Sequence, residues 1–236
     1  MSDDRHLDWD GCFNVRDLGG LRSADGRETR LGAVVRADAV DRLTAAGWAA
    51  LQAHGVRTVI DLRNVDELEP DVAPRPAGLA TVRLALDGIE DAEFWDHWKE
   101  QAPPLYYGPF LGRFPGRVAG VIAAIARARP GGVLIHCVGG RDRTGLIAML
   151  LLALVGVAPD DIAADHALST DRLVALYAQS GQDDQGPMLE EFLAREGTTA
   201  RELILSTLAA LDVEDYLRAA GLGEHDMVAL RERLLA

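Results

Sequence analysis

The sequence predicts an α/β fold in which a central, mostly parallel sheet is flanked by helices and followed by a helical C-terminal third. In the first part of the chain, short runs rich in β-branched residues alternate with segments of helical periodicity. The run 133–137 is largely apolar, which is typical of a parallel strand buried on both faces. From residue 144 onward the pattern is helical. Strands separated by helices, followed by helices alone, indicate this fold class.

Each element has a local signal. Residues 44–55 are predicted as a helix, with Thr44 as N-cap and Gly55 just past its end. Residues 56–62 and 80–86 are predicted strands because of their β-branched and apolar side chains. Apolar positions 118, 121, 122 and 125 share one face of a helix that ends before Pro130. After the strand 133–137, one helix is expected over 145–155. A second is expected to start at 159–161, and a third at the capping box formed by Thr199 and Glu202.

Two segments have the composition of loops: 69–78, with three prolines, and 179–187, with two glycines and two aspartates. The chain has no repeat of fixed period and no recognisable interdomain linker. A chain of 236 residues is long enough to bury a sizeable core. We therefore expect a single domain over 1–236, with an α/β part over about 12–170 and C-terminal helices over about 171–236.

The charge balance excludes a general binder of polyanions. The formal net charge is −13, from 37 acidic and 24 basic residues, so nucleic acid and anionic membranes are not expected as partners. Most of this charge lies late in the chain, since residues 1–150 carry 21 acidic and 18 basic side chains. An anion site is therefore expected in the first part. Because Lys99 is the single lysine, nearly all the cations are arginines, and one arginine near a nucleophile proves little by itself.

The cysteine count and the apolar runs place the chain among reduced, soluble proteins. Cys12 and Cys137 are too few for a disulfide framework or a cysteine-rich zinc site, and we expect neither a metal nor another cofactor. The acidic N-terminus has no apolar signal segment, and the longest apolar run, about 14 residues, is shorter than the ~20 needed to span a bilayer. A cytoplasmic location without membrane insertion is expected, and secretion without a signal stays open. The oligomeric state is not predicted.

The candidate catalytic and binding residues are concentrated in residues 135–145, IHCVGGRDRTG, where the predicted buried strand meets the start of a helix. Ligands of α/β sheets bind at such junctions. Gly139 and Gly140 allow the backbone to curl tightly, so that the N–H groups of 138–143 and the helix N-terminus can surround a tetrahedral dianion. The same field stabilises a thiolate, which makes Cys137 the candidate nucleophile.

The neighbouring side chains suit phosphoryl transfer. Arg143 can grip two phosphate oxygens bidentately, and Thr144 offers a hydroxyl to the sulfur. Asp142 is a carboxyl that could protonate the leaving oxygen and later activate water. The predicted phosphate-binding residues are Val138, Gly139, Gly140, Arg141 and Thr144.

This string resembles the HCxxGxxRTG phosphate loop of cysteine-dependent tyrosine phosphatases, and it is most similar to bacterial members that also act on phosphoserine or phosphoinositides. Residues 14–20, NVRDLGG, resemble the N-terminal NxRDxGG of that family, and they are followed by an arginine-bearing strand at 34–36 and by VIDLR at 59–63. The resemblance covers about 14–170. It implies a hydrolase that works through a phosphocysteine on phosphorylated proteins or small phosphomonoesters. Arg141 stands where the family usually has lysine, which puts a preference for phosphoinositides in doubt.

Several alternatives stay open. Asp87, after the strand 80–86, is a second candidate acid behind Asp142. The rival to an enzyme is a catalytically silent phosphate-binding module, and a rhodanese or arsenate reductase is a weaker third possibility. His136 is expected to be buried on the opposite face of its strand from Cys137. The motif 14–20 is expected to shape a turn and an ion pair, and Asp61 with Arg63 a structural pair; the aromatics 94–98 and 106–107 either line the pocket or pack a helix.

Overall fold

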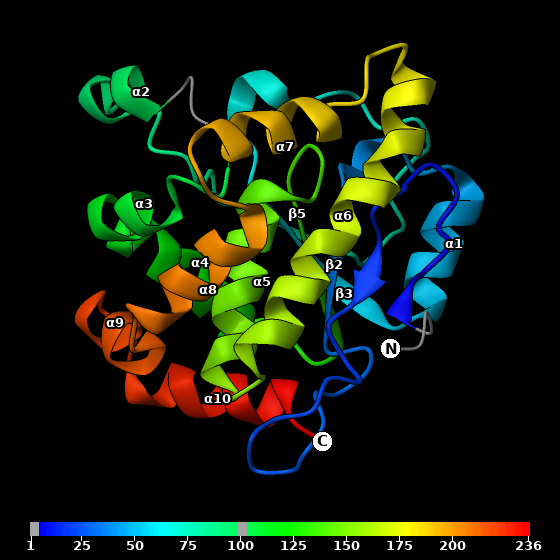
Figure 1. Ribbon diagram of the computed structural model, residues 1–236. Coiled ribbons are helices and arrows are strands. Elements are labelled where there is room, and N and C mark those ends of the chain that lie inside the picture. The colour runs from blue at the N-terminus through cyan, green and yellow to red at the C-terminus, as the bar shows by residue number, and fades with distance from the viewer. Residues whose placement is uncertain (1–4, 99–102) are drawn as a thin grey trace.

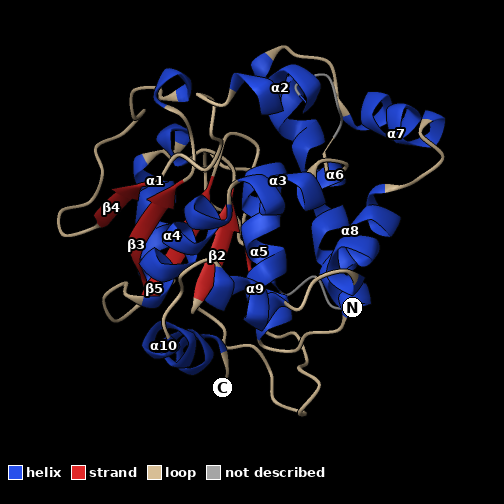
Figure 2. Cartoon of the chain, turned by 90° about the vertical axis from the view of Figure 1, so that its left-hand side faces the viewer, coloured by secondary structure: helices blue, strands red, loops and turns tan. Residues whose placement is uncertain are grey.

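Five strands form one sheet at the centre of the computed structural model, which describes residues 5–98 and 103–236 (Figures 1 and 2). The strand order is β1-β2-β5-β3-β4. The edge strand β1 runs antiparallel to β2, whereas β2, β5, β3 and β4 are parallel. The predicted fold class is therefore confirmed. The bounds are β1 (Arg16–Asp17), β2 (Val34–Ala37), β3 (Val56–Asp61), β4 (Ala80–Arg83) and β5 (Gly132–His136).

Helices lie on both faces of the sheet, and the edge strand β4 is largely exposed (Figure 2). They are α1 (Ala45–Ala53), α2 (Ala92–Trp98), α3 (Tyr107–Arg113), α4 (Pro115–Ala126), α5 (Asp142–Leu154), α6 (Pro159–Ser180), α7 (Gly186–Arg195), α8 (Ala200–Ala209), α9 (Val213–Ala219) and α10 (Glu224–Leu234). Two 3-10 turns, η2 (Val40–Arg42) and η3 (Val65–Glu67), follow β2 and β3. None of the described helices is both long and apolar enough to cross a membrane.

The alternation of side chains in β5 divides the core into two layers. Val133 and Ile135 join the larger apolar cluster with α4 and α5, whereas Leu134 joins a second cluster with α1. The larger cluster also contains Ile204 of α8 and Leu217 of α9, so the C-terminal helices pack on the same core as the sheet.

Most predicted elements are present, with shifted ends. The predicted N-caps Thr44 and Thr199 accept hydrogen bonds from backbone N–H groups of α1 and α8, each at 3.2 Å. The predicted strand 80–86 is too long, since β4 ends at Arg83; Leu84 and Leu86 still donate to the carbonyl oxygens of Asp61 and Leu62, where β3 itself ends. The predicted loop 179–187 is shorter, since α6 extends through Ser180 and α7 begins at Gly186.

The carboxyl ends of the parallel strands lie level at one edge of the sheet. His136, the last residue of β5, is in register with Ala37 of β2 and with Asp61 of β3. The segments that leave these strands, beginning at Asp38, Leu62 and Cys137, therefore start side by side. This edge is where an α/β sheet places its site.

Candidate active site

Cys137 lies directly after β5, at the start of a loop that leads into α5. Its side chain is buried, and the backbone N–H of Gly140 donates to its sulfur at 3.3 Å. The N-terminus of α5 carries no side-chain cap, so its first N–H groups are left for a ligand. The helix dipole adds positive potential at this point. Loop and helix end together form an anion cradle around the sulfur.

Gly140 is required by the geometry of this loop. Its φ is +69°, a conformation that other residues rarely adopt. A Cβ atom there would lie 2.3 Å from the carbonyl oxygen of Ala37. By contrast, a Cβ on Gly139 would lie 3.5 Å from Leu173, at an ordinary contact distance. Only glycine at position 140 permits both this φ and the close approach to β2, and the loop can therefore curl around the sulfur.

A cavity of about 320 Å³ opens above the cradle. Residues 137–139 and 141–143 form its floor, and Arg42 of η2 borders one side. The end of α6 supplies an apolar wall from Leu173, Leu176 and Tyr177. Polar side chains complete the rim: Ser180, Gln182 and Gln185. The cavity thus combines an anion site with a wall that suits an apolar group.

Arg143 is held by two carboxylates from neighbouring loops. Its Nη1 and Nη2 donate to both carboxylate oxygens of Glu67, at 2.5 and 2.6 Å. Asp87 lies 3.2 Å from Nη1. These contacts orient the guanidinium beside Cys137, and they leave the pKa of Arg143 above its ordinary value although burial acts in the opposite direction. Glu67 was not predicted as a site residue.

Asp142 and Arg141 form an ion pair with each other. Arg141 donates through Nε and Nη2 to the two carboxylate oxygens of Asp142, at 2.9 and 3.3 Å. Burial raises the pKa of Asp142, but the neighbouring Arg141 outweighs burial, so the pKa lies below its ordinary value. In this arrangement Asp142 is a carboxylate.

Asp87 has the opposite protonation tendency. Burial is the main cause that raises its pKa, the carboxylates of Glu67 and Asp142 add to the effect, and Arg143 opposes it. Asp142 borders the cavity above Cys137, whereas Asp87 borders a small neighbouring space that it shares with Asp142, Arg143 and Tyr106. The two candidate acids are therefore both close to Arg143, but only Asp142 also borders the cavity that contains Cys137.

A buried network of charges supports the loop from below. Asp165 of α6 receives hydrogen bonds from Arg5, Arg16 and Arg36, at 2.9, 3.2 and 2.8 Å. Arg36 also donates to the carbonyl oxygen of Gly140 at 2.8 Å. Three cations on one buried carboxylate leave excess positive charge beneath the cradle. Burial, with Arg36 as the next cause, lowers the pKa of Arg16 to about 9, and these arginines hold the pKa of Asp165 below its ordinary range.

The N-terminal motif joins this network rather than reaching the cavity. Asn14 donates from Nδ2 to the carbonyl oxygen of Gly139 at 2.9 Å and accepts from Arg16. Asp17 accepts from the backbone of Gly19 at 2.7 Å, which closes the turn. The motif thus forms a turn and an ion pair, as predicted. Its asparagine additionally holds the loop that follows Cys137.

The structural pairs around β3 and β5 agree with the sequence. Arg63 binds Asp61 through Nε and Nη2, at 3.0 and 2.9 Å. His136 is fully buried on the face opposite Cys137, and its Nε2 lies 3.6 Å from Asp61. Burial, partly opposed by Asp61, lowers the pKa of His136 to about 4. This histidine is therefore neutral near pH 7.

None of the aromatic side chains at 94–98 and 106–107 lines the cavity that contains Cys137; they pack on the core, and Tyr106 and Tyr107 also border the small space beside Asp87. Phe94 packs against Phe114 at a ring distance of 5.0 Å and belongs to the core. Tyr107 belongs to the same core cluster, and it also donates to the backbone oxygen of Asp142 at 2.8 Å and contacts His166, so it supports the first turn of α5. The Thr144 hydroxyl is buried and has no hydrogen-bond partner among the described residues. Among all the residues that the structure describes, no group of three or more His, Cys, Asp or Glu side chains is arranged to hold a metal ion.

Comparison with known proteins decides the family. The model of the tyrosine phosphatase family matches residues 7–236. The chain belongs to the tyrosine phosphatase family. The match extends over the C-terminal helices, which the sequence motifs did not reach, and it confirms the resemblance that the motifs of residues 14–145 indicated.

Three relatives are similar in sequence to this member of the tyrosine phosphatase family over most of its length. A Cupriavidus necator protein provisionally named a tyrosine-protein phosphatase is 36% identical over 71% of this chain and 64% of its own length. A tyrosine-protein phosphatase of Nostoc commune is 32% identical over 86% of this chain and 74% of its own. The triple specificity protein phosphatase PtpB of Mycobacterium tuberculosis is 29% identical over 89% of this chain and 85% of its own length. The chain thus spans slightly less than two thirds of the first of these relatives.

Proposed function

We propose that the protein is a hydrolase of phosphomonoesters, with protein phosphotyrosine as its main substrate, that works through a phosphocysteine intermediate. The observation that carries this proposal is the contact of the Gly140 N–H with the Cys137 sulfur at 3.3 Å, at the uncapped N-terminus of α5. A backbone donor on a sulfur favours the thiolate, which is the nucleophilic form of cysteine. Membership of the tyrosine phosphatase family supports the same chemistry.

In the first step the Cys137 thiolate attacks phosphorus. A sulfur–phosphorus bond forms, and the bond from phosphorus to the ester oxygen breaks. The loop N–H groups and Arg143 bind the three remaining phosphoryl oxygens, where charge is concentrated in the transition state. Because two carboxylates already orient Arg143, little side-chain entropy is lost when phosphate binds.

The ester oxygen leaves as a hydroxyl once it receives a proton, and we assign this transfer to Asp142. Its carboxyl group borders the cavity that contains Cys137. A general acid must reach the leaving oxygen before its pKa matters. Arg141 borders the same cavity, so a bound phosphate dianion can draw its guanidinium away from Asp142. Loss of that partner raises the pKa of Asp142 and allows it to carry a proton.

In the second step water attacks the phosphocysteine. Asp142, now a carboxylate, accepts the proton from the attacking water, and the sulfur leaves again as a thiolate. Inorganic phosphate is the product. The unpartnered hydroxyl of Thr144 in the first turn of α5 is the group we assign to stabilise that leaving thiolate.

The shape of the cavity supports phosphotyrosine as the substrate. Its volume of about 320 Å³ and the wall of Leu173, Leu176 and Tyr177 suit the ring of a phosphorylated tyrosine. Two relatives are named tyrosine-protein phosphatases, and a third is named a triple specificity phosphatase. Hydrolysis of phosphoserine and phosphothreonine at lower rates is therefore included in the proposal, with phosphoinositides as the alternative substrates.

We also propose that residues 1–236 act as one phosphatase domain. The shared apolar cluster supports it, since Ile135 of β5, Ile204 of α8 and Leu217 of α9 pack together in it. The lining of the cavity by α6 supports it as well, because the helix that begins the C-terminal part completes the site.

Hydrolysis of p-nitrophenyl phosphate in the presence of EDTA tests the function. The wild type is expected to turn over, and Cys137→Ser is expected to lose activity while Cys12→Ser retains it. Retained activity in Cys137→Ser contradicts the mechanism. Tight binding of a phosphotyrosine peptide with no turnover between about pH 5 and 8 indicates a silent phosphate-binding module instead.

A further inference from the structure

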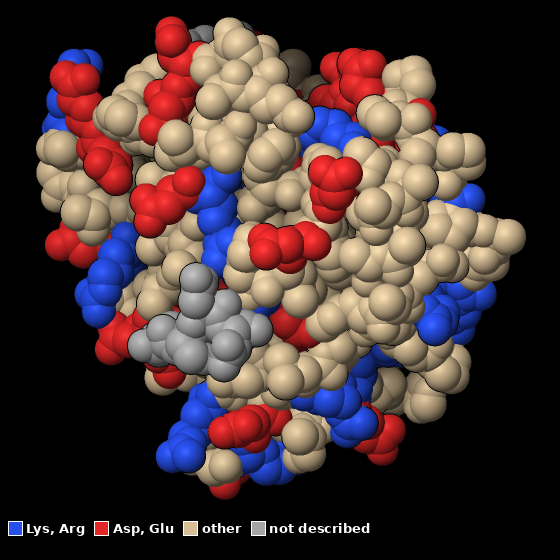
Figure 3. Space-filling model, turned by 90° about the vertical axis from the view of Figure 1, so that its right-hand side faces the viewer, with Lys and Arg blue, Asp and Glu red and all other residues tan. Residues whose placement is uncertain are grey.

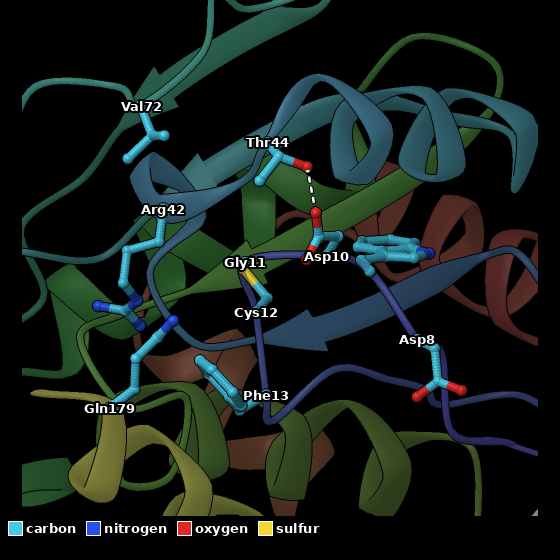
Figure 4. Close-up of a pocket in the computed structure, with 10 residues that line it drawn as sticks. Asp8, Asp10, Gly11, Cys12, Phe13, Arg42, Thr44, Val72 and Gln179 are labelled. Atoms are coloured by element: carbon cyan, nitrogen blue, oxygen red, sulfur yellow. Dashed lines mark hydrogen bonds between the residues drawn. The ribbon is translucent and has the colours of Figure 1, made fainter.

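A second cavity, of about 720 Å³ (Figure 4), shares a lining residue with the cavity that contains Cys137. Arg42 borders both cavities. Gln179 of α6 borders the second cavity, and the next residue, Ser180, borders the first. The two spaces are therefore neighbours, separated by one arginine side chain and the end of α6.

The wall of this second cavity comes mainly from the N-terminal segment 8–13. Figure 4 shows Arg42 and Gln179 together at one end and Asp8 at the other, with Asp10 between them. Phe13 lies on the side of Arg42 and Gln179. A ligand that enters from the phosphate site passes Arg42 first and then meets the two aspartates.

The charge of the second cavity is opposite to that of the phosphate site. The guanidinium of Arg42 donates to the buried Asp38 at 2.9 Å, so its positive charge is already compensated. The Asp10 carboxylate accepts a hydrogen bond from the neutral Thr44 hydroxyl at 2.7 Å, and Asp8 contacts His6 at 2.9 Å. No lysine or arginine of the described chain forms an ion pair with either aspartate. Arg172 contacts His6 in turn but does not line the cavity, so Asp8 and Asp10 are the charged side chains that line the end remote from the phosphate site.

On the face of the molecule shown in Figure 3, acidic and basic side chains occur in small groups separated by wide uncharged areas. Charges more than ~10 Å away on an exposed surface are largely screened, so recognition at the second cavity depends on the carboxylates that line it.

We propose that this second cavity binds the lysine or arginine side chain of a residue close to the phosphorylated residue of a protein substrate. The proposal rests on the proposed phosphatase function and names its substrate class. The cationic head group would pair with Asp8 and Asp10, while the aliphatic stem would pack against Phe13. A phosphoinositide head group has additional phosphates and no cation, so this subsite favours a peptide.

The distance along the peptide follows from the shared wall. Adjacent residues of an extended chain are separated by ~3.3–3.6 Å, and one arginine side chain separates the two cavities, so the cation should lie within about three residues of the phosphotyrosine. An acidic side chain at the same position would be repelled by both aspartates.

The test uses phosphotyrosine peptides that are otherwise uncharged and carry a single arginine at each of the three positions on either side. For each enzyme we compare kcat/KM of the arginine peptide with that of the alanine peptide, so that the ratio reports the subsite and not the rate of chemistry. The wild type should prefer arginine about three- to tenfold at one or two positions, as expected for partly exposed ion pairs. A glutamate peptide should be slower than the alanine peptide.

Asp8→Asn with Asp10→Asn should abolish this preference. The control is Glu196→Gln with Glu232→Gln, which changes the net charge equally at two exposed positions outside both cavities and should keep the preference. Asp8→Asn alone alters a carboxylate that is 96% exposed, so the fold should be retained and part of the preference lost.

A ratio below about twofold at every position in the wild type overturns the subsite, as does an unchanged ratio in the double variant. Failure of the phosphatase function is distinguishable from failure of the subsite. An enzyme that does not hydrolyse p-nitrophenyl phosphate can still be titrated with the peptides carrying a non-hydrolysable phosphonate, and the same preference in Kd is then expected.

Discussion

Arg36 donates a hydrogen bond from Nη2 to the carbonyl oxygen of Gly140 at 2.8 Å, from beneath the loop that holds Cys137. Its Nη1 is bound to Asp165 at 2.8 Å, so the guanidinium is fixed between α6 and the loop. A carbonyl that is held downward directs the neighbouring N–H groups upward to the sulfur. The buried arginine therefore positions the cradle without touching the substrate.

Replacing Arg36 by methionine should remove this support. A hydrogen bond from a charged donor contributes ~1.5–3 kcal/mol, so kcat/KM for p-nitrophenyl phosphate should fall about 10- to 100-fold. The inhibition constant of inorganic phosphate should rise in parallel, because the ground-state anion uses the same cradle. Arg36→Lys keeps the charge and should recover part of the loss. If phosphate inhibition is unchanged in Arg36→Met, the arginine has no positioning role.

Gly140→Ala should damage both folding and activity. The φ of +69° costs a non-glycine residue about 1 kcal/mol or more, and the new Cβ would lie 2.3 Å from the Ala37 oxygen. We expect a lower Tm and a loss of kcat/KM of at least about 100-fold, since the contact with the sulfur is displaced. Gly139→Ala is the matched control in the same loop and should retain most of both. Equal effects of the two substitutions in thermal unfolding would contradict this account.

Asp142→Asn and Asp87→Asn should differ in how they respond to the leaving group. Loss of a general acid typically costs 10²–10⁴-fold, and the cost is greatest when the leaving oxygen is strongly basic. Asp142→Asn should therefore slow phenyl phosphate much more than p-nitrophenyl phosphate. Asp87→Asn, which removes a partner of Arg143, should slow both substrates to a similar extent. The reverse pattern would transfer the acid role to Asp87.

Two buried histidines should make the protein less stable at mildly acidic pH. Burial lowers the pKa of His136 to about 4 and that of His166 to about 3, whereas an unfolded histidine titrates near 6.5. Between these pH values the unfolded state binds more protons than the native state. The free energy of unfolding is therefore highest above about pH 6.5 and decreases as the pH falls. The two groups together should lower the free energy of unfolding by about 4 kcal/mol from pH 7 to pH 5.

Urea denaturation at several pH values measures this slope. His166→Gln should remove about half of it, because one of the two titrating groups is gone. A replacement of the exposed His225 serves as the control for a histidine on the surface. A free energy of unfolding that stays constant between pH 7 and pH 5 would exclude neutral buried histidines in the native state.

The sequence was most informative where function depends on neighbours in the chain. The strand, the two glycines and the start of α5 are consecutive, so residues 132–145 could be predicted as one unit. The parallel sheet followed from the alternation of strands and helices. Local signals also predicted the N-caps of α1 and α8, since a cap depends on residues within one turn.

Contacts between distant segments were beyond the reach of one sequence. Glu67 and Arg143 are 76 residues apart, and Arg36 and Asp165 are 129 apart. Neither pair shares a helix face or a strand register that a periodic pattern would indicate. The ion pair of Arg141 with Asp142 was missed for a different reason: adjacent side chains pair only when the backbone turns, as it does where α5 begins.

Direct trapping of the intermediate tests the central claim. The protein is mixed with phosphotyrosine peptide, turnover is quenched in acid within milliseconds, and the digested protein is analysed by mass spectrometry. We predict one phosphoryl group on Cys137, absent from Cys137→Ser and accumulated in Asp142→Asn with p-nitrophenyl phosphate, whose leaving group needs no acid. Turnover by the wild type with no phosphoryl group on Cys137, or with the group on another residue, would contradict the mechanism.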